Sequence, residues 1–350
     1  MTTYTQLQLT RPIIQAPMAG GASSPQLVAA VSNAGGLGSF ACGMISSQQM
    51  REGVAHIRSL TSKAFALNLF ILPESVQPDA AALAASKAWL DPALRQVGLS
   101  MPTPAAWSQS FQAQFATLLE LAPTVASFAF GILNPAQVAA LKQRNILVIG
   151  TANSVEHMQA WLDVGADAVI VQGVEAGGHR GGPTELAAAQ ELALDDLLAA
   201  CRPLSDKPLI AAGGIMNGER ISALLEAGAN AVQMGTVFLC SDECGASAVM
   251  KQALWQRRDQ PTRLTRLFSG KPARGVVNAW MQQLAEHESD TLPYPYHNAL
   301  TTPLRTWANQ ANEPDYLALW AGTGLPHIQK TSATNILDAL YPVVATESAS

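Results

Sequence analysis

Residues 164–173 read VGADAVIVQG, and residues 227–236 read AGANAVQMGT. Each stretch has a glycine suited to end a helix, then a short polar turn, then an apolar run of β-forming residues. A helix that leads through a turn into a buried strand is the unit from which parallel α/β sheets are built. The two stretches therefore predict equivalent structural units, each a helix that leads through a turn into a strand, within one fold.

Six other apolar runs follow the same pattern, with helical sequence between them. Runs of four to eight residues are too short for buried helices. The eight predicted strands are 13–16, 37–41, 64–70, 127–131, 146–152, 168–173, 209–213 and 231–235. This pattern favours a (β/α)8 TIM barrel, although a doubly wound open sheet would look locally similar with fewer strands.

Four of the predicted helices have polar residues suited to cap their first turn. These residues are Ser24, Asn134, Ser154 and Asn217. Their side-chain oxygens can accept a hydrogen bond from a free backbone N–H at the start of the helix.

Two long segments interrupt the alternation of strands and helices, one after the third strand and one after the eighth. Both leave the carboxyl ends of strands, which form the active-site face of a TIM barrel. We predict a barrel made of residues 1–72, 125–250 and 315–350. Residues 73–124 and 251–314 are predicted to form a helical, substrate-binding cap over its mouth.

Composition excludes several classes of function. The 350-residue chain is 48% hydrophobic and 13% charged, with a formal net charge of −5. A chain without a basic footprint is not expected to bind nucleic acid. No apolar run is long enough for a membrane span and the first residues lack a signal-peptide core, so we expect no membrane association and a cytoplasmic protein. The four cysteines suit neither a disulfide framework nor a zinc site, and no metal is expected.

Glycine-rich turns follow several of the predicted strands. In TIM barrels, a phosphate is often bound by the loops after strands seven and eight, which here contain Gly213, Gly214, Gly235 and Thr236. The alternative is that the Gly213–Gly214 pair only permits a tight packing turn. No dinucleotide or Walker motif is present, so FMN is a better candidate than a dinucleotide.

His179 is the strongest single candidate for catalysis. It lies among four glycines after the sixth predicted strand, which points it toward the mouth of the barrel. A histidine there can act as a general base, or as a donor beside an anionic intermediate. The alternative is a surface-loop histidine. His56 and His157 lie in helical sequence and are expected to be solvated.

Three amides lie on strands that otherwise have core composition: Asn68, Gln172 and Gln233. A buried amide needs hydrogen-bond partners. These could come from the barrel interior, but three amides on three strands favour one shared polar ligand.

Several longer stretches together resemble the class I nitronate monooxygenases. They are PIIQAPMAGG (12–21), AVSNAGGLGSF (30–40), FALNLF (65–70), VQGVEAGGHRGG (171–182), AAGGI (211–215), QMGTVFL (233–239), FSGKPARG (268–275), PYPYHNALTTPLR (293–305) and YLALWAGTG (316–324). The resemblance implies a barrel with a cap, non-covalent FMN, and a detoxifying oxidation of alkyl nitronates such as propionate 3-nitronate by O2, giving carbonyl compounds and nitrite.

The resemblance also implies roles for individual residues. His179 matches the catalytic histidine, and either Tyr294 or Tyr296 would face the substrate. Lys271 stands where the family pattern has arginine, which keeps the charge but loses the planar fork. The implied FMN contacts are Ala16, Pro17, Met18, Ala19, Gly20, Asn68, Gln172, Gly177, Gly178, Gly213, Gly214, Gln233, Gly235, Thr236, Trp320, Ala321 and Gly322.

Two other functions are compatible with the same residues. One is an NAD(P)H-dependent flavin reductase of quinones or enoyl thioesters, and the other is a flavin-binding module without turnover. In the favoured hypothesis the partners are a small-molecule nitronate and O2, and the protein is a monomer or homodimer.

Overall fold

Eight parallel strands form a nearly closed barrel in a computed structural model of the chain, which describes residues 9–74 and 77–342. The strands are β1 (Ile13–Gln15), β2 (Gly38–Ala41), β3 (Phe65–Phe70), β4 (Val125–Ala129), β5 (Leu147–Ala152), β6 (Ala168–Gln172), β8 (Leu209–Ala212) and β9 (Ala231–Met234). They pair in the order β1-β9-β8-β6-β5-β4-β3-β2, and a parallel bridge between Ile14 and Leu37 joins the ends of the sheet. The predicted TIM barrel is confirmed.

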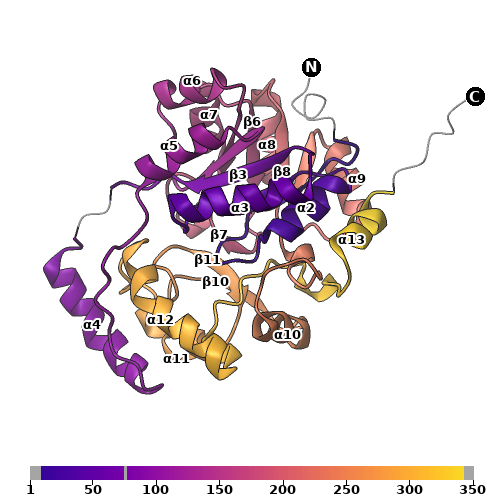
Figure 1. Cartoon of the computed structure of the whole chain (residues 1–350). Helices are drawn as coiled ribbons and strands as arrows, with labels where there is room; N and C mark the ends of the chain where they lie inside the picture. The colour runs from indigo at the N-terminus through magenta and orange to yellow at the C-terminus, as the bar shows by residue number, and fades with distance from the viewer. Residues whose placement is uncertain (1–8, 75–76, 343–350) are drawn as a thin grey trace, which may run out of the picture.

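Helices alternate with these strands, and most of them cover the outside of the barrel, whereas α4 (Ala80–Arg95) and α12 (Tyr296–Ala311) lie to one side of it (Figure 1). The helices are α2 (Pro25–Asn33), α3 (Ser47–Leu60), α4 (Ala80–Arg95), α5 (Phe111–Leu121), α6 (Pro135–Lys142), α7 (Val155–Asp163), α8 (Leu194–Cys201), α9 (Gly218–Glu226), α10 (Ala248–Gln256), α11 (Ala279–Gln283), α12 (Tyr296–Ala311) and α13 (Ala333–Leu340). No helix of the described residues is long and apolar enough to cross a membrane.

The barrel interior is filled by side chains rather than left open. Buried residues from the strands form one apolar cluster there, among them Ile14, Val125, Ile149, Ile170 and Ile210. The opposite faces of the same strands pack against the helices in a larger cluster. Strands with two apolar faces explain why the sequence shows continuous apolar runs rather than alternation.

The four predicted helix caps are observed. Ser24, Asn134, Ser154 and Asn217 each accept a hydrogen bond from the backbone N–H three residues later, at 2.8–3.2 Å. These bonds fix the point at which each helix begins.

Beyond shifts of one residue at strand ends, the structure differs from three local predictions. Residues 251–314, predicted to be helical, also contain the short strands Thr262–Thr265 and Ala273–Val276. The fourth strand covers Val125–Ala129 rather than 127–131, because Phe130 leaves the strand with a positive φ of 73°. His157 is buried rather than solvated, whereas His56 is exposed as predicted. The Nδ1 atom of His157 accepts the backbone N–H of Asn153 at 3.3 Å, and its Nε2 atom lies 2.8 Å from the Thr184 hydroxyl.

A second sheet and a separate apolar cluster lie beside the barrel. Strands β10 (Thr262–Thr265), β11 (Ala273–Val276) and β7 (Gly178–His179) pair antiparallel, so the segment after β6 is tied to the segment after β9. Figure 1 shows β10 and β11 gathered with α10, α11 and α12 on one side of the barrel.

The two long inserted segments meet in that second cluster. Leu90 and Leu94 of α4 and Trp107 belong to it together with Phe268 and Leu300 from the later segment. Helix α5, by contrast, contributes Phe111 and Leu118 to the main cluster around the barrel. Of the predicted domain ranges, residues 1–8, 75–76 and 343–350 lie outside the described part of the chain.

Candidate active site

His179 lies in the short strand β7, directly after the turn that follows β6. Its backbone is held on both sides, because residue 179 pairs with Ala273 of β11 and its carbonyl accepts a hydrogen bond from Gln172 Nε2 at 3.2 Å. Its ring nitrogen Nε2 lies 2.8 Å from Ser269 Oγ. The imidazole is therefore oriented by two segments that are far apart in the sequence.

Three aromatic rings surround this imidazole edge to face. The ring centroids of Phe130, Tyr294 and Trp320 lie 5.6, 5.9 and 5.4 Å from that of His179. They come from the loop after β4, the loop before α12 and the C-terminal segment. The enclosure limits the access of water to the imidazole.

This enclosure keeps the imidazole neutral. Loss of hydration lowers the pKa of His179 to about 3, and the positive charges of Lys271 and Arg305 act in the same direction. At neutral pH the ring is an uncharged donor and acceptor. Its Nδ1 atom has no hydrogen-bond partner among residues 9–74 and 77–342.

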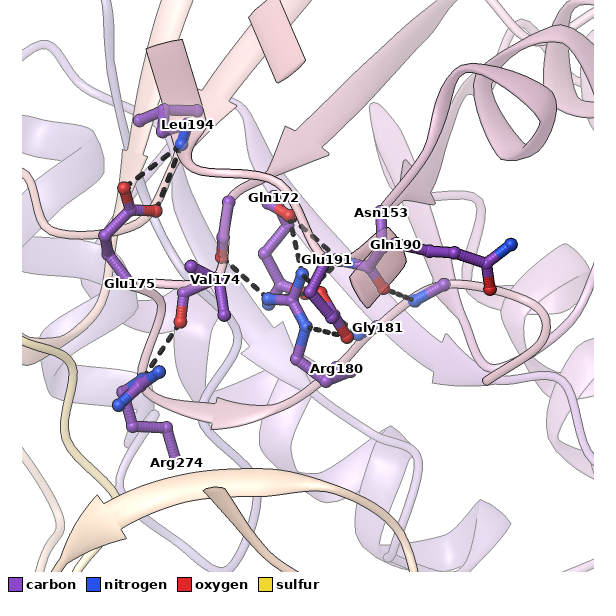
Figure 2. A network of polar contacts seen from close by, with 12 residues as sticks. Asn153, Gln172, Val174, Glu175, Arg180, Gly181, Gln190, Glu191, Leu194 and Arg274 are labelled. Carbon is purple, nitrogen blue, oxygen red and sulfur yellow. Dashed lines mark hydrogen bonds and ion pairs between the residues drawn. The ribbon is translucent and has the colours of Figure 1, made fainter. Parts of the chain in front are cut away.

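A buried ionic network holds the turn that carries His179 (Figure 2). The Arg180 guanidinium donates to both carboxylate oxygens of Glu191, at 3.1 and 2.6 Å, and to the carbonyls of Gln172 and Gly173, at 3.0 and 2.6 Å. Gln172 Oε1 also accepts the N–H of Gly181 at 2.9 Å. The residue next to His179 is thus clamped to the end of β6.

Two further contacts fix the first half of the same turn. Both Glu175 carboxylate oxygens accept the N–H of Leu194 at 3.1 Å, at the start of α8, and Arg274 Nε donates to the carbonyl of Val174 at 2.9 Å (Figure 2). A turn rich in glycine therefore has one fixed shape, supplied by its neighbours.

The glycine turns after different strands converge on the C-terminal segment. A Cβ atom on Gly177 would lie 2.4 Å from the backbone nitrogen of Gly322, and the same N–H donates to Thr236 Oγ1 at 3.0 Å. Gly214, with φ of +68°, lies against Glu175 and Thr323. Backbone groups can approach each other this closely only where side chains are absent.

The loop after β1 lies against the glycine turn at Gly235. A Cβ atom on Gly235 would lie 3.4 Å from the Ala16 side chain and 3.7 Å from Met18 Sδ. The N–H of Met18 is held by Ser23 Oγ at 2.8 Å. Around Gly20, as around Gly178, a Cβ atom would meet no other atom within 4 Å. The structure thus places most of the predicted FMN contacts on one set of neighbouring turns; Pro17, Ala19, Gly213, Trp320 and Ala321 lie on the same turns and segment.

The three predicted amides have different surroundings. Gln172 is bound by protein atoms, whereas Asn68 uses only its Nδ2 group, which donates to the hydroxyl and carbonyl oxygens of Ser127 at 3.0 and 3.2 Å. Within the described ranges, neither Asn68 Oδ1 nor the Gln233 amide has a hydrogen-bond partner. These free polar atoms suit a ligand with amide-like edges.

The two candidate tyrosines occupy different positions. Tyr294 lies beside His179 and Phe130, and burial raises its pKa well above the usual range. The Tyr296 ring packs against Trp107, with centroids 5.4 Å apart. The structure brings only the first of them to the imidazole.

Two residues of the site, Phe130 and Ser269, were not singled out by the sequence. Lys271, noted there only as a departure from the family pattern, lies over the Phe130 ring. Ser269 and Lys271 do lie in the family motif FSGKPARG, but a serine 90 residues from the histidine gives no spacing signal. In the described part of the chain, no group of three or more His, Cys, Asp or Glu side chains could hold a metal ion.

Known proteins were compared with this chain as a whole. The family model described as nitronate monooxygenase matches residues 1–342. A probable nitronate monooxygenase of Staphylococcus saprophyticus is 37% identical over 95% of this chain and 94% of that protein, and one of Bacillus subtilis is 36% identical over 96% of each. The crystal structure of a nitroalkane oxidase from Streptomyces ansochromogenes is 38% identical, with a TM-score of 0.89 over 97% of this chain and 96% of that one. These matches over nearly the whole chain show that it belongs to the nitronate monooxygenase family.

Proposed function

We propose that this protein is an FMN-dependent nitronate monooxygenase, which oxidises alkyl nitronates such as propionate 3-nitronate with O2 to carbonyl compounds and nitrite. The observation that carries this proposal is the neutral His179 imidazole, enclosed by aromatic rings beside the buried cation Lys271. Such a site suits a small organic anion. The role would be the removal of toxic nitronates.

FMN fits the residues present. Its phosphate would bind the backbone N–H groups of the turns at Gly213–Gly214 and Gly235–Thr236, where glycine permits close approach. Its ring would meet the free polar atoms of Asn68 and Gln233 and lie beside the open backbone at Gly178. When bound, FMN would supply the electron acceptor of the reaction.

The residues around His179 would hold and orient the substrate. A nitronate is already an anion with an electron-rich carbon, so no proton has to be removed from it. His179 Nδ1 is the ring atom available to a ligand, because Nε2 is bound to Ser269. Tyr294, Phe130 and Trp320 would exclude water from the reacting carbon, which strengthens every polar contact there.

The same imidazole would act only slowly on neutral nitroalkanes. Those substrates need a base to remove a proton from carbon, and a histidine with a pKa of about 3 is a weak base. We expect the Nε2–H tautomer, because Ser269 Oγ donates its own hydrogen to the Lys271 carbonyl at 3.1 Å. The lone pair on Nδ1 would then take the proton.

The test is anaerobic mixing of the purified protein with propionate 3-nitronate, and separately with NADH and NADPH, while the flavin absorbance is recorded. Loss of the oxidised flavin spectrum with the nitronate but not with the nicotinamides is the expected result. Reduction by nicotinamides alone would contradict the proposal and favour a quinone or enoyl thioester reductase. Binding without reduction by any of them would indicate a flavin-binding module without turnover.

We also propose that residues 73–124 and 251–314 form a cap that selects the substrate, because both segments contribute to the apolar cluster against which Tyr296 packs. A cytoplasmic location and a monomeric or homodimeric state stay predictions.

A further inference from the structure

Lys271 is a buried lysine whose backbone is tightly held. Only 7% of the residue is exposed. Its carbonyl accepts the Ser269 hydroxyl at 3.1 Å, and the next residue, Pro272, accepts the N–H of Arg180 at 2.9 Å. Lys271 therefore sits between the serine that contacts His179 and the arginine that follows His179.

The ammonium group of this lysine has no counter-ion in the part of the chain that the structure describes. In the described ranges of the chain, Lys271 Nζ makes no ion pair or hydrogen bond with another residue. The nearby carboxylate of Glu185 is paired with Arg266 at 2.5 Å. Other buried cations are satisfied: Arg180 pairs with Glu191, and Arg305 donates to backbone and side-chain oxygens of the α12 region.

A buried charge without a partner is costly, and burial accordingly lowers the pKa of Lys271. The carboxylates of Glu185 and Glu191 also act on Lys271, but without forming an ion pair with it. A largely buried lysine without a direct partner is a good receptor for an anion that enters from outside. The attraction between the two charges is strong because little water separates them.

The ring of Phe130 contacts both this ammonium group and the imidazole. Lys271 Nζ lies 5.0 Å from the centroid of that ring, within the range of a cation–π contact. The same ring lies edge to face with both His179 and Tyr294. Phe130 has a φ of 73°, unusual for a bulky residue, and a hydrogen bond from its N–H to the Gly181 carbonyl at 2.9 Å holds it there.

We propose that Lys271 binds the negatively charged oxygens of the nitronate group and thereby selects anionic nitronates over neutral nitroalkanes. This inference rests on the function proposed above. The lysine is a positioning and specificity residue: its ammonium would pair with the oxygens of the substrate, and His179 would face the adjacent carbon.

The test compares K271M with K271R in the flavin-loaded enzyme. The control is K330M, because Lys330 also stacks on an aromatic ring, that of Trp255 at 4.7 Å, but is exposed. Substrates are ethyl nitronate and nitroethane, which share one carbon skeleton. Binding is measured independently by calorimetric titration with nitrate, a planar anion that resembles the substrate head group.

We expect K271M to raise KM for ethyl nitronate and the Kd for nitrate by about 30-fold or more, the usual loss when one partner of a desolvated charge pair is removed. KM for nitroethane should change much less. K271R should recover most of the binding, and K330M should match the wild type.

Two results would overturn the inference while leaving the proposed function intact. One is nitrate that does not compete with the nitronate in the wild type, and the other is a K271M variant that oxidises ethyl nitronate and binds nitrate as K330M does. The wild-type competition needs no variant, so a misfolded K271M does not block the test. Lysine-dependent nitrate binding in a protein that oxidises no nitronate would support the anion site and reject only the proposed function.

Discussion

Replacing Glu191 with glutamine should destabilise the protein by about 3 kcal/mol, because it leaves the buried Arg180 guanidinium without its counter-ion. The two side chains are only 4% and 10% exposed, and two N–H···O contacts join them. Removal of one partner of a buried pair typically costs about 3–5 kcal/mol. The lower end applies here, because the carbonyls of Gln172 and Gly173 still accept hydrogen bonds from the guanidinium.

The assay is urea unfolding followed by near-ultraviolet circular dichroism at neutral pH. The chain offers a matched control in Arg51 and Glu120, which form the same two-pronged contact at 2.9 and 2.6 Å but are 41% and 56% exposed. Solvent screens this pair, so Glu120→Gln should leave the unfolding midpoint unchanged within error.

A double variant distinguishes the destabilisation caused by an unpaired Arg180 from the net contribution of the Arg180–Glu191 ion pair to stability. Arg180→Met with Glu191→Leu removes both charges, so it should be more stable than Glu191→Gln alone. If Glu191→Gln unfolds like Glu120→Gln, or if the double variant is as unstable as the sum of the single ones, the reasoning about desolvation is wrong.

Three more results are expected. His179→Asn should reduce kcat/KM on neutral nitroalkanes by about 100-fold or more, and much less on preformed nitronates, because only the former need a base; equal losses in steady-state assays would contradict the base role. Gly177→Ala should lower the FMN content of the purified protein, since the new Cβ would lie 2.4 Å from the backbone nitrogen of Gly322, and an unchanged flavin-to-protein absorbance ratio would reject this. Burial lowers the pKa of His297 to about 4, below the 6.5 of a free histidine. The contribution of His297 to the free energy of unfolding should be fully present above pH 6.5. It should fall by about 3 kcal/mol as the pH falls from 6.5 toward 4. His297→Gln should make the pH dependence of the urea midpoint clearly shallower without removing it, because the lowered pKa of His179 acts in the same direction. A profile as steep as that of the wild type would exclude His297 as a contributor.

Local chemistry explains why the barrel could be predicted from the sequence. A buried parallel strand needs an apolar run, and a helix needs a cap, and both signals lie within a few residues of each other. Ser24 and Asn134 could therefore be identified without knowledge of the fold. His179 was predictable for a similar reason, because its glycine neighbours are adjacent to it in the chain.

Contacts between distant segments could not be predicted in the same way. Strand β7 has two residues and exists only because β11 pairs with it. Strands β10 and β11, in a segment for which the sequence predicts helices, are four residues long and carry arginines that hide the β pattern. The burial of His157 follows from the turn at Thr184, which folds back over α7.

The contacts of Gly322 also determine at which point of its synthesis the protein can complete the set of glycine turns around Gly177. The cradle of glycine turns is complete only when the segment around Gly322 has reached Gly177 and Thr236. All eight strands of the barrel leave the ribosome well before that segment, since β9 ends at Met234. The barrel can therefore begin to fold while the chain is still growing, but the proposed FMN site is complete only after the segment around Gly322 has left the ribosome. A chain truncated before Trp320 would keep every barrel strand and lose one wall of the site.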